Sequence, residues 1–143
     1  MKKLFLSLAL LLFLPISVYA NDFMRITTYI EVGDMTIPII KEVEVTRHLT
    51  VQAVAYSPEQ TNLSPYTFSG LPLVAGLAAV DPNVIPLGTY FYVPGYGLFL
   101  AADIGSAIRG YMVDLAFDTI AEALEFGRKN VELFVLDMVT DLF

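Results

Sequence analysis

The sequence is built from short runs in which apolar and polar residues alternate, separated by turn-forming residues. Residues 24–32, 42–46 and 50–56 each show this period of two, and Gly33-Asp34 is a predicted turn after the first run. Strict alternation is typical of a strand that buries one face. We therefore expect much of the chain to form strands.

Further short strands are predicted later in the chain, over residues 77–80, 90–93, 97–102 and 131–138, joined by turns that contain Pro or Gly. One helix is predicted, because Thr119 and Glu122 form a potential capping box and Gly127 can end the helix that follows. Many short strands with one short helix favour an all-β fold, and specifically a small β-barrel, over a layered α/β sheet.

The segment 57–76 is predicted to be a long loop. It contains three prolines, two glycines and many hydroxyl side chains. Long loops in compact domains frequently carry function, so this segment is a candidate for a functional role.

The N-terminal segment 1–20 has the features of a secretory signal. Lys2 and Lys3 precede an apolar run that is too short to span a bilayer, and small residues stand before a cleavage position after Ala20. An uncleaved N-terminal anchor is the alternative. We expect an exported protein, periplasmic or extracellular, with no stable membrane insertion after cleavage. It would have a strand-rich extension over 21–49 and a barrel domain over 50–143.

The charge and cysteine content exclude several function classes. Without Lys2 and Lys3, six basic residues face fifteen acidic ones, giving a net charge of −9. Such a protein is repelled by nucleic acids and by anionic membrane surfaces. The chain has no Cys, so disulfides and thiol catalysis are both excluded.

Three aspartates in apolar surroundings form the candidate site: Asp81, Asp103 and Asp114. Asp114 lies between the apolar residues Val113 and Leu115. Burial of an unpaired charge is costly, so a carboxylate at this position indicates a functional role. Asp81 directly precedes Pro82, and Gly105 stands two positions after Asp103. Both aspartates therefore also have a structural interpretation as turn residues.

Several segments together carry a resemblance to a known family. They are Ala53-Val54-Ala55-Tyr56-Ser57-Pro58, the segment from Ala79 to Thr89, the segment from Asp103 to Asp114, and the Ala-x-x-Phe-Gly pattern over 123–127. In this order they resemble the 3D domain, named for its three aspartates and found in secreted bacterial cell-wall proteins. The similarity covers about residues 50–136. It implies a six-stranded double-psi β-barrel related to the barrel-type lytic transglycosylases.

The resemblance also implies an activity. Such enzymes cut peptidoglycan between N-acetylmuramic acid and N-acetylglucosamine without water and leave a 1,6-anhydro end. Asp114 matches the family's acid/base, and Asp103 and Asp81 match the other two aspartates, which line the same cleft. An acid of this kind needs a raised pKa. We expect Met112, Val113 and Leu115, together with the charge of Asp103, to raise the pKa of Asp114.

Other residues are assigned to substrate binding or excluded from the site. Arg109, Tyr56 and Thr89 are predicted to contact the glycan, although Arg109 could equally neutralise the aspartates and Tyr56 could belong to the core. His48, the only histidine, is expected at an exposed strand position. With one His and no Cys, zinc is not expected. The aspartate spacing matches no calcium loop, and no cofactor is expected.

The sequence departs from the family pattern at three positions. Ile104 replaces a Thr, Arg109 replaces a Lys, and Val54 replaces another Thr. Loss of the two hydroxyls would weaken the hydrogen-bond network around the carboxylates, which affects catalytic turnover and not the fold. They keep open a non-catalytic, expansin-like wall-binding module, or a protein-interaction role in the envelope. Strand exchange through residues 24–45 would give a homodimer and is a further alternative.

Overall fold

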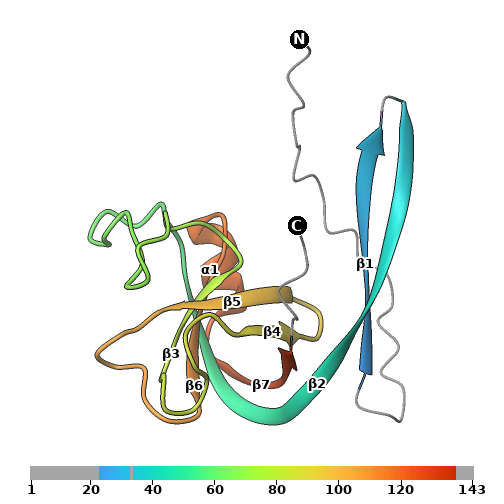
Figure 1. Ribbon diagram of the computed structural model, residues 1–143. Helices are drawn as coiled ribbons and strands as arrows, with labels where there is room; N and C mark the ends of the chain where they lie inside the picture. The colour runs from blue at the N-terminus through green and yellow to red at the C-terminus, as the bar shows by residue number, and fades with distance from the viewer. Residues whose placement is uncertain (1–22, 33, 138–143) are drawn as a thin grey trace. The chain divides into compact units, whose positions relative to one another are not determined.

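A computed structural model of the chain describes residues 23–32 and 34–137 (Figure 1). The chain divides into two compact units, of which the first ends at Glu42 and the second begins at Val43. The signal segment predicted over residues 1–20 lies outside the described residues.

The first unit contains strand β1 (Phe23–Val32), which pairs with the first part of strand β2 (Met35–Tyr56). The two strands are separated by the predicted turn, in which Asp34 is described. Across the pair, Arg25 forms an ion pair with Glu42 at 3.0 Å. The described residues of the first unit thus form a strand pair, and the strand predicted over residues 24–32 is confirmed as β1.

Strand β2 is longer than expected. Separate strands were predicted over 42–46 and 50–56, but β2 runs without interruption for 22 residues. The intervening residues Arg47, His48 and Leu49 include no Gly, Pro, Asn or Asp, which are the residues that usually form turns. The alternation therefore continues through them, with an irregularity in the pairing between Val45 and Arg47.

The second unit is a closed six-stranded barrel. Its further strands are β3 (Leu77–Val80), β4 (Tyr90–Val93), β5 (Gly97–Asp103), β6 (Met112–Ala116) and β7 (Lys129–Asp137). The strands follow the order β2-β6-β3-β5-β4-β7, and the pairing of β2 with β7 closes the ring. The pairs β2–β6 and β3–β5 are parallel, and the others are antiparallel. The prediction of a mainly β, six-stranded barrel is confirmed.

The barrel has an inner core and a second apolar cluster on its outside. Alternate residues of the strands fill the interior, which contains Val51, Ala53, Ala78, Val80, Phe91, Val93, Phe99, Ala101, Val113, Leu115, Leu133 and Val135. The outer cluster consists of Tyr56, Leu77, Ala102 and Ala116, with Leu73 and Leu100 packed against it. Leu73 belongs to the loop 57–76, so this loop covers part of the outer face of β2, β6, β3 and β5.

The predicted helix is confirmed as α1 (Ile120–Phe126). Thr119 Oγ1 accepts a hydrogen bond from the N–H of Glu122, and the Glu122 side chain accepts one from the N–H of Thr119. Gly127 ends the helix with a positive φ of 67°, a conformation that glycine adopts without strain. Among the described residues, none of the helices has the length and apolar character needed to cross a membrane.

Candidate functional site

Two of the three candidate aspartates face the same small residue. Ala79 of β3 pairs with Asp114 of β6 on one side and with Asp103 of β5 on the other. Directly opposed residues project from the same face of a sheet. The register between β3 and β5 shifts at this point, so that Asp103 rather than Ala102 lies opposite Ala79, as β-bulges commonly re-aim a side chain. The two carboxyl groups therefore flank a single methyl group.

Asp114 is a half-buried carboxyl group with a raised pKa. Burial is the main cause, the charge of Asp103 adds to it, and Arg128 opposes it, which together bring the pKa to about 6. The predicted increase is confirmed. Its source differs in part, because Val113 and Leu115 point into the barrel interior. The burial comes instead from cross-strand neighbours such as Ala79 and Val54, which pair with Asp114.

Asp103 is held in place by the backbone. Its Oδ1 accepts hydrogen bonds from the N–H groups of Phe68 and Ile104, both at 2.9 Å. Phe68 belongs to the loop 57–76, and the next N–H of this loop, from Ser69, donates to the carbonyl of Ala102 at 3.0 Å. The loop is thus fastened to the end of β5. The predicted long loop therefore lies beside one of the candidate aspartates.

Tyr56 places a phenol beside these carboxyl groups. Its ring belongs to the outer cluster and its side chain is only 8% exposed. Burial raises its pKa above the ordinary value, and the charges of Asp103 and Asp114 raise it further. The phenol therefore keeps its proton at neutral pH and can act only as a hydrogen-bond donor towards a carboxylate or ligand oxygen.

Two buried side-chain polar atoms of the described residues lack a hydrogen-bond partner, and both belong to this site. They are the hydroxyl of Tyr56 and Oδ1 of Asp114. A buried polar group without a partner costs free energy, and such groups are few in native proteins. Their occurrence together indicates a position where a ligand or water supplies the missing hydrogen bonds.

Asp81 occupies a different environment. Its Oδ2 accepts the N–H of Gly110 at 2.7 Å, and its Oδ1 accepts both the backbone and side-chain N–H of Asn83. The hydrogen bond from Gly110 is the largest cause that lowers the pKa of Asp81, and Arg109 makes a minor contribution. Asp81 thus ties the turn after β3 to the loop that precedes β6. Its proposed place in the catalytic site remains a prediction.

The other two predicted binding residues, Arg109 and Thr89, interact with other parts of the chain. Arg109 is exposed, and its charge helps to lower the pKa of Asp81. The cation that lowers the pKa of Asp114 is Arg128 instead. Thr89 precedes β4, and its backbone bonds to Pro86 and Ala101. Neither residue is shown to contact the Asp103–Asp114 pair. Their roles in substrate binding stay predictions.

Arg128 is a site residue that the sequence analysis did not identify. It is exposed, donates a hydrogen bond to Gln52 Oε1 at 2.9 Å, and lowers the pKa of Asp114. Gln52 pairs with Met112, two residues before Asp114 in the same strand. Arg128 follows the helix-ending Gly127, and only the closure of the barrel brings it near β6.

His48 lies on β2 at an exposed position, as predicted. It forms an ion pair with Glu132 and stacks on the ring of Phe134 with centroids 4.5 Å apart. Within the described part of the chain, no three His, Asp or Glu side chains are grouped so that they could hold a metal ion.

Residues 77–137 match the 3D domain. The predicted resemblance is confirmed for this segment, which runs from β3 to the end of β7 and includes all three candidate aspartates. The segments 53–58 and 57–76, which contribute Tyr56 and the loop over Asp103, precede the matched part.

Two curated proteins of Bacillus subtilis strain 168 are similar in sequence. The chain is 42% identical over 98 residues to the cell wall-binding protein YocH, and the match covers 66% of this chain and 34% of YocH. It is 41% identical over 93 residues to YabE, whose name refers to cell wall shaping, and this match covers 62% of this chain and 23% of YabE. The chain thus matches only about a third or less of these relatives.

Solved structures of lytic transglycosylases are more distant. MltA from Escherichia coli is 20% identical with a TM-score of 0.44, over 73% of this chain and 31% of MltA. LtgG of Burkholderia pseudomallei is 22% identical with a TM-score of 0.39, over 71% of this chain and 30% of LtgG. These values are too low to support a statement about activity.

Proposed function

We propose that this protein acts on the glycan strands of the bacterial cell wall as a lytic transglycosylase, with Asp114 as the acid/base. The observation that supports this most directly is the state of Asp114. It is half-buried, its pKa is raised to about 6, and one of its oxygens has no partner among the described residues. A carboxyl group in that state can donate and then recover a proton near neutral pH.

The proposed reaction needs only one such group. Protonated Asp114 donates its proton to the glycosidic oxygen as the bond from that oxygen to the muramoyl C1 breaks. The 6-hydroxyl oxygen of the same muramoyl residue then bonds to C1, and its proton passes to the Asp114 carboxylate. This step forms the anhydro ring and restores the acid. The two-carboxylate arrangement of ordinary glycosidases is not required, because the nucleophile belongs to the substrate.

The neighbouring residues are assigned supporting roles in the proposal. Asp103 raises the pKa of Asp114 and stabilises positive charge that develops on the sugar ring. Tyr56, whose hydroxyl has no partner among the described residues, donates a hydrogen bond to a sugar oxygen. Asp81, Arg109 and Thr89 complete the predicted site at its edges, with Asp81 shaping the loop through Gly110.

A second candidate function is wall binding without cleavage. It is favoured by the name of YocH, a cell wall-binding protein that shares 42% identity with the chain. The two positions where the family pattern has Thr, occupied here by Val54 and Ile104, remove hydroxyls on either side of the Asp103–Asp114 pair. In this alternative the same carboxyl groups and Tyr56 bind glycan oxygens but do not complete the reaction.

Both candidates place the protein in the bacterial envelope. We propose that the N-terminal segment 1–20 directs export and is removed, and that the substrate is met outside the cytoplasmic membrane. Mass spectrometry of the N-terminus of the protein recovered from the envelope tests this part. An intact Met1 would contradict it.

The deciding experiment is mass spectrometry of the soluble products after purified peptidoglycan is incubated with the wild type and with D114N. The matched control is D137N, because Asp137 is an exposed aspartate at the end of β7. Anhydro-muramyl products from the wild type and D137N, but not from D114N, support the proposal. Reducing ends would indicate hydrolysis. No product, together with retention on sacculi, would favour the binding module.

A further inference from the structure

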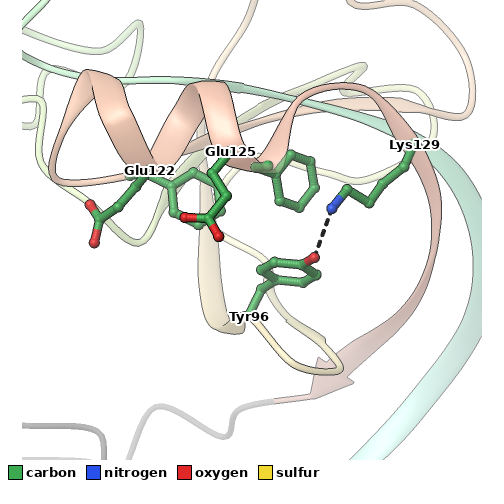
Figure 2. Close-up of a pocket in the computed structure, with 6 residues that line it drawn as sticks. Tyr96, Glu122, Glu125 and Lys129 are labelled. Atoms are coloured by element: carbon green, nitrogen blue, oxygen red, sulfur yellow. Dashed lines mark hydrogen bonds between the residues drawn. The ribbon is translucent and has the colours of Figure 1, made fainter.

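A pocket of about 350 Å³ lies away from the three aspartates, between α1 and the turn that joins β4 to β5. Figure 2 shows Glu122 and Glu125 extending from α1 on one side of this pocket, Lys129 on the other side, and Tyr96 below them. Phe117 and Phe126 complete the lining. Its volume is within the range of small-ligand sites.

Three aromatic rings form the floor of this pocket. The ring of Tyr96 meets the ring of Phe126 edge-on at 4.7 Å and that of Phe117 at 6.2 Å, and Phe117 lies 5.2 Å from Phe126. Aromatic groups that pack against one another hold their positions. The pocket is therefore preformed on its apolar side.

Lys129 is fixed at the edge of this floor. Its ammonium lies 4.4 Å from the centre of the Phe126 ring and 5.1 Å from that of Tyr96, and it donates a hydrogen bond to the Tyr96 hydroxyl at 2.8 Å. These contacts use one of its three N–H donors. Among the described residues no carboxylate lies within ion-pair distance of this ammonium.

The carboxylates of the opposite side differ in availability. Glu122 accepts hydrogen bonds from the backbone and hydroxyl of Thr119 and so serves as the helix cap. Glu125 is exposed and makes no hydrogen bond or ion pair within the described part of the chain. The pocket thus presents one available anion and one available cation, separated by an aromatic floor.

We propose that this pocket binds the end of a peptide that carries both an ammonium and a carboxylate, with Glu125 receiving the ammonium and Lys129 the carboxylate. The charge pattern selects such a dipolar end, because a neutral sugar would leave both charges unpaired and a simple ion would pair only one. The identity of the peptide rests on the proposed function, in which the protein acts on the cell wall. In the cell wall, this is the peptide stem that is attached to the glycan strand.

Binding of short peptides to the full chain tests the inference. The probe is N-acetylated Ala-Lys, which has one ammonium and one carboxylate, compared with its C-terminal amide and its side-chain-acetylated form. Calorimetric titration is expected to show that each modification weakens binding by about tenfold, equivalent to about 1.4 kcal/mol. K129Q should remove the preference for the free carboxylate. E125Q should remove the preference for the free ammonium.

The control variant is E44Q, which changes an exposed glutamate of β2 outside the pocket and should bind like the wild type. The inference is overturned if the parent peptide does not bind, if neither variant alters its preference, or if a neutral chitin oligosaccharide displaces it. D114N should bind the peptide normally. Anhydro products without peptide binding would therefore refute only this inference, and peptide binding without glycan cleavage would refute only the proposed activity.

Discussion

Asp103 raises the pKa of Asp114 from across the intervening strand β3, while backbone N–H groups hold Asp103 itself in place. The two residues therefore have different environments, although both are aspartates that pair with Ala79. One is held by hydrogen bonds, and the other is buried with an unpartnered oxygen. Such divergence separates the roles of two carboxyl groups in one site.

The first prediction concerns the pH dependence of glycan cleavage. The acid step needs protonated Asp114, whose pKa is about 6. The rate should therefore fall as the pH rises through about 6, by about tenfold per pH unit at higher pH. Rates of release of anhydro products over a pH series test this. A rate that increases with pH through this range would contradict the acid role of Asp114.

The second prediction concerns D103N. An asparagine keeps an oxygen that can accept the N–H groups of Phe68 and Ile104, but it removes the charge that helps to raise the pKa of Asp114. The pKa of Asp114 should fall towards its ordinary value. The decline in cleavage should then begin at a lower pH than in the wild type. Direct titration of Asp114 by carboxyl-carbon NMR measures the same shift without substrate.

The third prediction concerns the stability of D114N. The folded pKa of about 6 lies above the ordinary value of 3.8, so the folded protein binds this proton more tightly than the unfolded chain does. The favourable contribution of Asp114 is complete below about pH 4 and is lost as the pH rises through about 6. Near neutral pH, the free energy of unfolding of D114N should therefore be about 1–2 kcal/mol larger than that of the wild type, after allowance for the partial exposure of Asp114. The variant should be the more stable protein.

Urea unfolding of D114N and of the wild type, each at neutral pH and below about pH 4, tests this prediction. The difference between the two proteins should nearly vanish below about pH 4, where Asp114 is protonated in both states. A loss of stability in D114N at neutral pH would show that the charged form of Asp114 is instead favoured by the fold.

The fourth prediction concerns Y56F. The Tyr56 hydroxyl is buried without a partner, so removing it should leave stability unchanged or raise it by about 1 kcal/mol. If the hydroxyl binds a sugar oxygen, the same variant should raise KM for glycan fragments. Thermal unfolding and steady-state kinetics of one preparation measure both effects. Destabilisation with unchanged KM would assign Tyr56 to the core alone.

The fifth prediction concerns D81N. An amide nitrogen next to the N–H of Gly110, or next to those of Asn83, would place two donors together. The variant should therefore be less stable than the wild type at neutral pH. Because the pKa of Asp81 is lowered, the difference should shrink as the pH falls through the folded pKa. Equal urea midpoints at neutral pH would contradict a structural role for this carboxylate.

The local structure of this chain was largely predictable from its sequence. The cap formed by Thr119 and Glu122 and the strands at 77–80 and 90–93 depend on neighbouring residues, and each was found within the predicted limits. Strand β6 (Met112–Ala116) was not predicted, because Asp114 was considered as a site residue and the segment around it was not examined for alternation. The alternation of Val113 and Leu115 with Asp114 was nevertheless the signal of a strand with an outward-facing carboxylate.

The arrangement of the candidate site was less predictable, because it depends on pairing between distant strands. The proximity of Asp103 and Asp114 was expected from their shared motif, but the role of Ala79 between them follows only from the register. Arg128 and the loop residue Phe68 reach the site through barrel closure and a backbone hydrogen bond. Neither carries a sequence pattern that would reveal such a contact.

Closure of the barrel depends on pairing between distant parts of the chain. The β2–β7 pair brings together residues such as Thr50 and Glu132, which are 82 positions apart in the chain. Such non-local pairing forms slowly, because the loss of chain entropy precedes the gain from contacts. Until β7 is available, β2 and β4 each expose an unpaired edge that can recruit strands of other chains. Pairing of β7 with both β2 and β4 therefore covers the two edges at which a strand of another chain could add.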